Sequence, residues 1–479
     1  MTIKRISIAL ARDAMTGGCA GASRLAVPAL VLVLGAACRD VTVPNYNNPS
    51  VNSLTSTPTA SVVNTAVLGM LVQYRGGVNA ETWQMGSFGR EAYNLLQAEP
   101  RDLLGFYAGP IVPGGFAQDI GWTSSYTNLR AAQVILVAVD KVGAYTAQQK
   151  ESVKGFVQTI AAMELLRQIK VRDTLGIVVD VGDNPDVLGA VLGKDAVLAR
   201  VAALLDSAAT HLLAGGAAFP FTLTSGFAGF NTPPTFLLVN RGIKTRVDLY
   251  QRHWQQALTD VNASFIDVSS PSLTTLSKGA YNVWSSASGD TPNPLFDPTP
   301  TALYVHPSIV SGAQKRADGT PDLRLTRKTA AGNVRTLQGV QGTTKFVIYA
   351  SQSDPTPIIK NEELILMRAE AEFQLGNTAA AVADLNVVRV ASGGLAPLAA
   401  DFSGDFITEL LYNRTYSLLL EQGTRWIDAR RYGRLAQLPK TSGGTFTEQI
   451  FPYVMFPDAE CTQRGLSSTA AACSQVPGM

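Results

Sequence analysis

Residues 357–389 read "PIIKNEELILMRAEAEFQLGNTAAAVADLNVVR". Helical periodicity begins at Asn361 and resumes after the Gly376-Asn377 pair. Glycine and asparagine readily end a helix and turn the chain. After the turn, the small side chains of Ala380 and Ala381 allow a second helix to approach the first closely. This stretch therefore predicts a helix–turn–helix.

An earlier segment repeats the end of this pattern. "ALTDVN" at 257–262 matches "AVADLN" at 381–386, and each lies in the later part of a helix–turn–helix. Paired helices of this kind are the unit of tetratricopeptide proteins. More than a hundred residues separate the two copies. We therefore expect a body of helical hairpins with long insertions rather than a regular solenoid.

The rest of the chain divides into regions that differ in periodicity and composition. Helical patterns occupy residues 60–74, 81–96, 122–141, 147–170 and 197–213. Residues 265–345 are instead rich in Ser, Thr, Pro, Gly and Asp, which indicates loops with short strands. The sequence predicts a mainly α fold with an irregular lobe. Its parts are a helical body at 60–264 and 361–435, a ligand-facing insertion at 265–345 and a C-terminal loop region at 436–479.

The N-terminus has the features of an export signal. Four basic residues precede the apolar run "LAVPALVLVLGAAC", which ends at Cys38 and is too short to span a bilayer. We expect residues 1–37 to be a lipoprotein signal, with Met1 or Met15 as the start, and Cys38 to carry the lipid. The alternative is an ordinary secretory signal. Residues 38–59, rich in Pro, Asn, Ser and Thr, are then expected to form a tether.

Charge argues against a nucleic-acid ligand. The chain has 39 basic and 37 acidic residues. Residues 1–37 contribute four of the bases and one of the acids, so the mature chain of about 440 residues is near neutral. A nucleic-acid binder needs a surplus of Lys and Arg to displace counterions from phosphates. We expect none as a partner.

Cysteines and histidines are few. After Cys38 only Cys461 and Cys473 remain, and in an exported protein such a pair indicates a disulfide, with two free thiols as the alternative. The three histidines are widely separated and no C-x-x-C occurs, which argues against structural zinc. "DVGDNPD" at 180–186 is better explained as an acidic turn than as a calcium loop. We expect neither a metal nor a cofactor.

Motifs for catalysis are also missing. There is no G-x-S-x-G, and no G-x-G-x-x-G follows a strand. "GAVLGKD" at 189–195 has its glycines too close for a phosphate loop, and Asp195 stands where Ser or Thr would hold magnesium. We therefore expect a binding protein rather than an enzyme.

Aromatic residues in the irregular segments are the candidates for binding. Sugar rings have apolar C–H faces that stack on Trp and Tyr, and such side chains lose little entropy on binding. Tyr281 and Trp284 lie in a Ser-rich context where no helix needs them for its core. We predict that these two bind ligand first, followed by Tyr107, Tyr304 and Trp83.

Three segments together resemble the SusD/RagB-like outer-membrane lipoproteins. Residues 357–389 match the family's strand followed by a Leu-x-Arg-Ala-Glu-Ala helix, and "WTSSYTNLRAAQVIL" at 122–136 matches its Trp-x-x-x-Tyr helix. "LLLEQGTRWIDARRYGRL" at 418–435 fits a Glu-x-Gly-x-Arg-Trp-x-Asp pattern. The motif residues are Arg368, Glu370, Glu421, Arg425, Trp426, Asp428 and Arg431. Ser417, where the family usually has Glu, and Lys360, where Arg is commoner, depart from the pattern.

The resemblance implies a function. Such a protein would be lipid-anchored in the outer membrane at the cell surface. It would capture glycan, or peptide in some cases, and deliver it to a TonB-dependent transporter of the SusC-like type without breaking any bond. Residues 418–435 would then be structural, with acids interleaved among the arginines, rather than a grip on a polyanion.

Two other functions stay open on the residues alone. A periplasmic tetratricopeptide-like scaffold would bind proteins or peptides through a groove along its helix pairs. A surface glycoside hydrolase would need two carboxylates about 5–10 Å apart in a cleft.

Overall fold

The computed structural model describes residues 51–184, 187–440, 444–467, 469 and 473. The predicted signal, the predicted lipidation site Cys38 and most of the predicted tether lie outside this range. All described residues belong to one compact unit, Asn47–Met479. Within the predicted tether, residues 51–55 form a short helix, α2 (Val51–Thr55), and its Leu54 is buried against the first helices of the body.

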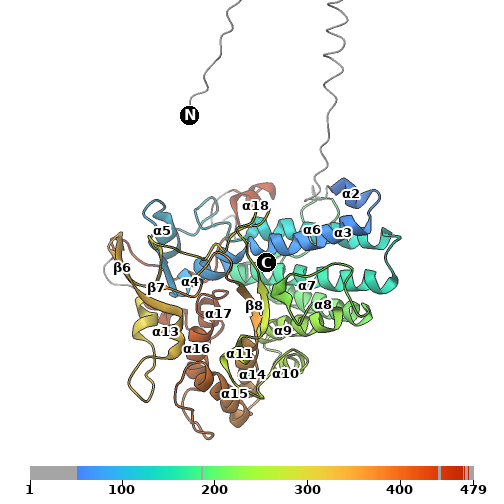
Figure 1. Ribbon diagram of the computed structural model, residues 1–479. Helices are drawn as coiled ribbons and strands as arrows, with labels where there is room; N and C mark the ends of the chain where they lie inside the picture. The colour runs from blue at the N-terminus through green and yellow to red at the C-terminus, as the bar shows by residue number, and fades with distance from the viewer. Residues whose placement is uncertain (1–50, 185–186, 441–443, 468, 470–472, 474–479) are drawn as a thin grey trace, which may run out of the picture. The chain divides into compact units, whose positions relative to one another are not determined.

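Helical hairpins build one side of this unit (Figure 1). The central helix is α7 (Ala147–Arg172), and nearly every residue from Ser152 to Arg172 is buried. Other helices cover α7 on several sides. Its neighbours are α3 (Ala60–Arg75), α6 (Trp122–Lys141), α8 (Lys194–Ala214) and α9 (Pro233–Gln251).

Local sequence explains where these helices begin. Thr146 caps α7 by accepting a hydrogen bond from the Gln149 backbone, while the Gln149 side chain accepts one from the Thr146 N–H. Thr232 and Thr235 form the same reciprocal cap on α9, with Pro233 at the first helical position. Helix α8 is apolar and long enough to cross a membrane. In this fold it packs between α7 and α9 as a core helix.

The hairpins expected from the sequence are present. Helix α9 is followed by α10 (Trp254–Asn262), and α14 (Asn361–Gln374) by α15 (Thr378–Ala391). Gly376 has a φ of +86°, so it provides the turn between α14 and α15. Ala381 is fully buried where these two helices pack. The predicted tetratricopeptide-like helical body is therefore confirmed.

One predicted helix is wrong in extent. The segment 81–96 is helical only as far as Phe88, through a π-helical turn (Ala80–Gln84) and α4 (Met85–Phe88). Gly89 then lies so close to Trp426 that a Cβ would be 2.8 Å from the Trp426 backbone nitrogen. Strand β1 (Ala92–Asn94) follows, and its residues are directed into the core. The helix therefore ends on a glycine, followed by Arg90 with a φ of +59°, at the place where Trp426 packs closely.

Strands β4 (Gly279–Asn282), β5 (Leu303–Val305), β6 (Thr329–Leu337) and most of β7 (Val340–Phe346) lie in the irregular lobe, and β4 and β5 each pair with a strand from outside it. An antiparallel sheet has the order β1-β5-β7-β6. Strand β4 pairs with β8 (Thr356–Lys360), and β2 (Ile177–Val178) pairs with β3 (Val191–Leu192). The pairing of β4 with β8 fastens the insertion to the strand that leads into α14. The remaining helices are α5 (Arg101–Tyr107), α11 (Leu273–Ser277), α12 (Pro307–Ser311), α13 (Leu323–Lys328), α16 (Phe406–Ser417), α17 (Thr424–Arg431) and α18 (Asp458–Gln463).

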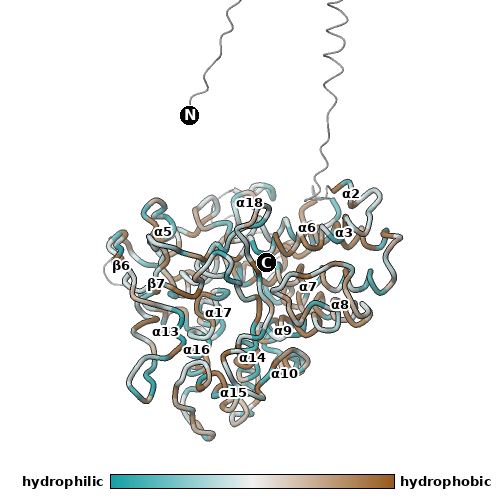
Figure 2. The backbone as a smooth tube through the Cα atoms, in the orientation of Figure 1, coloured by the Kyte–Doolittle hydropathy of each residue, from teal (hydrophilic) through white to brown (hydrophobic). Residues whose placement is uncertain are grey.

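Hydropathy follows this arrangement. Figure 2 shows hydrophobic stretches along the packed helices α7 and α8, whereas the loop beside α13 is hydrophilic. The largest apolar cluster lies among the hairpins, and a second cluster lies under the sheet and around Trp426.

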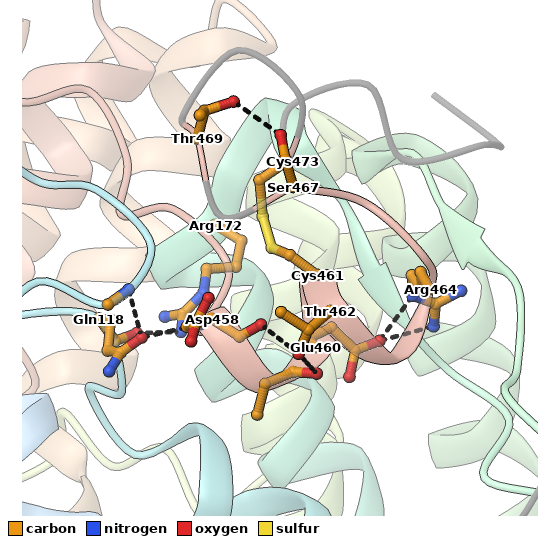
Figure 3. The surroundings of a disulfide bond; sticks show 12 residues. Gln118, Arg172, Asp458, Glu460, Cys461, Thr462, Arg464, Ser467, Thr469 and Cys473 are labelled. Carbon is orange, nitrogen blue, oxygen red and sulfur yellow. Dashed lines mark hydrogen bonds and ion pairs between the residues drawn. A yellow bond between two sulfur atoms is a disulfide. The ribbon is translucent and has the colours of Figure 1, made fainter.

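The C-terminal segment is tied down by a disulfide. Cys461 in α18 and Cys473 are joined, with their Cα atoms 5.5 Å apart, and both are fully buried (Figure 3). The same segment is held by hydrogen bonds: Gln118 accepts one from the Asp458 backbone at 2.8 Å, and Arg464 donates one to the Gly189 carbonyl at 2.8 Å. The cysteine pair thus has a structural role.

Candidate functional site

The corner at 418–435 is a network of buried ion pairs. Glu421 accepts from Lys360 at 2.8 Å and from Lys328 at 3.2 Å. All three side chains are largely buried, so each charge needs its partner. Burial alone would lower the pKa of Lys360, but Glu421 and Glu362 outweigh it and raise that pKa. Lys360 therefore fastens β8 to the turn before α17.

A second group of ion pairs joins α17 to two other helices. Asp428 accepts from Arg414 of α16 at 2.6 Å and from Arg431 at 3.1 Å. Arg431 also pairs with Glu370 of α14, which accepts a hydrogen bond from the Tyr432 hydroxyl at 2.8 Å. These contacts hold α14, α16 and α17 together.

Another motif residue of α14 has the same bracing role within its hairpin. Arg368 makes a bidentate pair with Asp384 of α15, at 2.6 and 2.7 Å. Ser417 stands where the SusD/RagB-like pattern usually has Glu. Its hydroxyl accepts a hydrogen bond from Arg324 at 3.0 Å.

Arg425 differs from expectation in its partners. The sequence suggested that it would be braced by the acids around it. Its guanidinium instead donates to the Arg90 carbonyl at 2.7 Å and to the Ser308 hydroxyl at 3.2 Å, while Glu91 accepts from its backbone N–H. Residue 90 lies more than three hundred positions upstream, and nothing in the local pattern identifies it.

Trp426 fills the space beneath this corner. Its indole is fully buried, donates to the Phe451 carbonyl at 2.8 Å and lies 5.0 Å from the Phe88 ring centroid. Gly423 begins α17 with a φ of +58°, and a Cβ there would be 2.3 Å from that of Met85. The motif residues of this segment are therefore arranged as scaffold.

Four of the five aromatic candidates do not face solvent. Trp83, Tyr107, Trp284 and Tyr304 are at most 8% exposed and belong to the second apolar cluster. The Trp284 indole donates to the Thr356 hydroxyl at 3.3 Å, and the Tyr107 hydroxyl donates to the Ala92 carbonyl at 2.6 Å. Rings packed in this way have no free face for a sugar. The prediction that these four bind ligand is therefore corrected.

Tyr281 is the exception. This half-buried residue lines a pocket of about 390 Å³, a size suited to a small ligand. Its hydroxyl donates to the Ser277 carbonyl at the end of α11, which fixes the ring. The opposite wall is the outer face of α3, where Leu68 is half buried and Val72 is 54% exposed. The pocket thus brings Tyr281 of β4 and apolar residues of α3 together among its lining residues.

A buried arginine holds one edge of this Tyr281 pocket. Arg75, at the end of α3, pairs with Asp290 at 2.5 Å and donates to the Val283 carbonyl at 2.5 Å. Its guanidinium also lies over the buried Trp284 ring, 5.2 Å from the centroid. Burial would raise the pKa of Asp290, but the hydrogen bonds from Arg75 and the Thr291 backbone, with the Arg75 charge, together outweigh it and lower that pKa. The loop after β4 is therefore pinned to α3 by a charged pair.

The chemistry of the pocket suits binding better than catalysis. Among the described residues that line it, Asp290 is the one carboxylate, and it is already paired. Hydroxyl groups come from Thr222, Thr224 and Ser288. Sequence reasoning found Tyr281 but missed Arg75 and Val72, because α3 reads only as an ordinary apolar helix. Over the described part of the chain no cluster of three His, Cys, Asp or Glu could hold a metal.

The acidic turn at 180–184 is engaged by its neighbours. Arg130 of α6 donates to the Asp183 carbonyl at 2.5 Å and also to that of Gly182, and Gln133 donates to the Asp183 carboxylate at 2.9 Å. These contacts fasten the turn to α6. Residues 185 and 186 lie outside the described range.

Comparison with solved structures identifies the fold. A SusD superfamily protein from Bacteroides vulgatus matches with a TM-score of 0.62 and 14% identity, over 84% of this chain and 97% of that one. A SusD-like carbohydrate-binding protein from Bacteroides fragilis matches with a TM-score of 0.64 and 13% identity, over 83% and 98%.

A third match carries a ligand. Surface glycan-binding protein A from Bacteroides thetaiotaomicron, in complex with laminarihexaose, gives a TM-score of 0.60 and 12% identity, over 84% and 97%. No family model matches the sequence, and no curated protein does. The chain therefore has the SusD-like fold, as its motifs predicted, at a sequence identity that identifies the fold alone.

Proposed function

We propose that this protein captures oligo- or polysaccharide in the Tyr281 pocket. The observation that carries the proposal is the pairing of a fixed, half-buried tyrosine with the exposed apolar face of α3. A sugar ring could stack its C–H face on Tyr281 while its hydroxyls bond to Arg75, Asp290 and Ser288. The fold, shared with carbohydrate-binding proteins, supports the same ligand class.

The mechanism is capture without chemistry. A hydrolase would need a second carboxylate beside Asp290. A shallow site that must order a flexible glycan is expected to bind in the micromolar to millimolar range. Such weak binding allows release to the next component.

The test is affinity electrophoresis of the chain from residue 39 onward in gels containing neutral polysaccharides. We expect one glycan class to retard the wild type. Tyr281→Ala should bind about tenfold or more weakly, since it loses both ring burial and aromatic contact. Tyr281→Phe is the matched control and should retain most of the affinity. Thermal unfolding checks that each variant is folded.

Two results would refute the proposal. One is that no glycan retards the wild type, which would favour peptide cargo or a scaffold. The other is retardation that is the same for the wild type and Tyr281→Ala, which would place the glycan elsewhere on the protein.

The same proposal extends to the cell. The chain would be anchored through lipid on Cys38 at the outer-membrane surface and would deliver its glycan to a TonB-dependent transporter. Purification of the native protein from detergent-solubilised membranes tests both points. Mass spectrometry should find the acylated cysteine at the N-terminus and a β-barrel receptor among the co-purified proteins. An unmodified N-terminus, or no receptor, would refute the corresponding part.

A further inference from the structure

A second, more polar cavity is lined by residues of α9, α10, α14 and α17. Figure 1 labels these four helices. Its volume is about 580 Å³, within the range of small-molecule sites. It shares no lining residue with the Tyr281 pocket.

The floor of this α9–α10 cavity contains charges that are only partly balanced. Asp173 lies 2.6 Å from the ammonium of Lys194 and 3.2 Å from the guanidinium of Arg430. One carboxylate thus serves two cations. The Asp173 and Arg430 side chains are less than 10% exposed, whereas that of Lys194 is 32% exposed and reaches the opening. Positive charge therefore remains at the rim.

Arg252 adds to this surplus. It is exposed, and within the described part of the chain it makes no ion pair with a carboxylate. Its guanidinium donates a hydrogen bond to the Arg431 carbonyl at 3.5 Å. Its φ is +61°, a left-handed conformation in which a residue with a Cβ is disfavoured relative to glycine. Arg252 is the left-handed C-cap that ends α9, which places its side chain at this cavity.

Aromatic rings supply the walls. Trp254, the first residue of α10, is half buried, and Tyr250 and Tyr432 lie on either side of Arg431. The Arg431 guanidinium is 5.0 Å from the Tyr250 ring centroid and 5.5 Å from that of Tyr432. Arg431 is occupied by its own carboxylates and rings, so the groups at the opening are Trp254, Arg252 and Lys194. The opening therefore combines a flat apolar surface with two cations.

We infer that this cavity is a second binding site, for a sugar ring that bears a carboxylate. The ring would stack on Trp254, and the carboxylate would pair with Arg252 and Lys194, since charge-assisted bonds to Arg are the stronger kind. The inference goes beyond glycan capture at Tyr281 and requires none of its residues. The α9–α10 cavity would bind acidic sugars, and the Tyr281 pocket would bind neutral ones.

The test is a titration by NMR or calorimetry of the chain from residue 39 onward, with D-galacturonate, D-galactose, acetate and sulfate as separate probes. The wild type should bind galacturonate at least about tenfold more tightly than the other three. Added salt should weaken this binding. Arg252→Gln should weaken it by about tenfold, and Trp254→Ala should weaken it as well.

Two control variants distinguish binding at the α9–α10 cavity from a general effect of charge and from binding at the Tyr281 pocket. Arg101→Gln removes the same charge from an exposed arginine on α5 and should leave galacturonate binding unchanged. Tyr281→Ala should also leave galacturonate binding unchanged. The proposal for the α9–α10 cavity can therefore fail or hold independently of the proposal for the Tyr281 pocket. The inference would be overturned if the wild type bound acetate, sulfate or galactose as tightly as galacturonate. It would also be overturned if Arg252→Gln bound galacturonate as tightly as the wild type does.

Discussion

At the scale of single residues, neighbours in sequence have opposite roles. Tyr281 and Trp284 are three residues apart in the same Ser-rich stretch. Tyr281 lies on the outward side of β4, whose burial alternates, and it lines a pocket. Trp284 follows the strand and packs inward under Arg75. Composition marks both as candidates, but only the strand register and the position of α3 separate them.

Glu91 gives a prediction on pH. Its two carboxylate oxygens accept from the backbone N–H groups of Leu420 at 3.0 Å and Arg425 at 3.1 Å. Burial nevertheless raises its pKa from 4.5 to about 7. Because the pKa is higher in the folded than in the unfolded state, the contribution to stability is complete below about pH 4.5 and is lost as pH rises through about 7.

The amide in Glu91→Gln cannot ionise. We therefore expect its free energy of unfolding to change less between about pH 5 and about pH 8 than that of the wild type, as measured by urea unfolding. Glu99→Gln is the control, since Arg101 holds the pKa of this exposed carboxyl below its usual value. Parallel pH profiles for the wild type and Glu91→Gln would contradict the role assigned to Glu91.

At the scale of elements, local sequence specifies the hairpins well. Periodicity alone places α3, α6, α7 and α8 within three residues of the helices observed. The failures arise where distant segments meet. Trp426 packs closely against Gly89, where α4 ends, and Arg425 is held by Arg90. No window of sequence contains both partners, so neither contact could be predicted.

The candidate site was predictable only in part, for the same reason. Tyr281 is marked by its polar surroundings, whereas Arg75 and Val72 belong to a helix two hundred residues away in sequence. Arg252 and Trp254 were read as parts of a hairpin, and their cavity exists only because α14 and α17 close around them. Sequence patterns identify elements, while a pocket is a property of several elements together.

The disulfide allows a prediction for the C-terminal element. Cys461 and Cys473 are 12 residues apart and close a short loop, so removing the bond should lower the free energy of unfolding by about 2–3 kcal/mol. The double variant Cys461→Ala/Cys473→Ala is compared with the wild type by denaturant unfolding. Reductant should lower the stability of the wild type and leave the variant unchanged. Equal stabilities without reductant would show that the bond contributes nothing.

At the scale of the whole molecule, a helical scaffold presents two different pockets. The arginines of 418–435 brace this scaffold, and two of them also line the second cavity. A near-neutral chain can therefore carry a local site for an anion without being a polyanion binder. The SusD-like fold fixes how these surfaces are supported, while the residues at each opening would determine the ligand.

A crystal structure with a bound oligosaccharide tests the central claim most directly. The chain from residue 39 onward is crystallised with a fragment of the neutral glycan that retards it most strongly in gels. We expect a sugar ring stacked on Tyr281 and facing Val72, with a hydroxyl within hydrogen-bond distance of Arg75 or Asp290. A glycan bound elsewhere, with the Tyr281 pocket empty, would contradict the account.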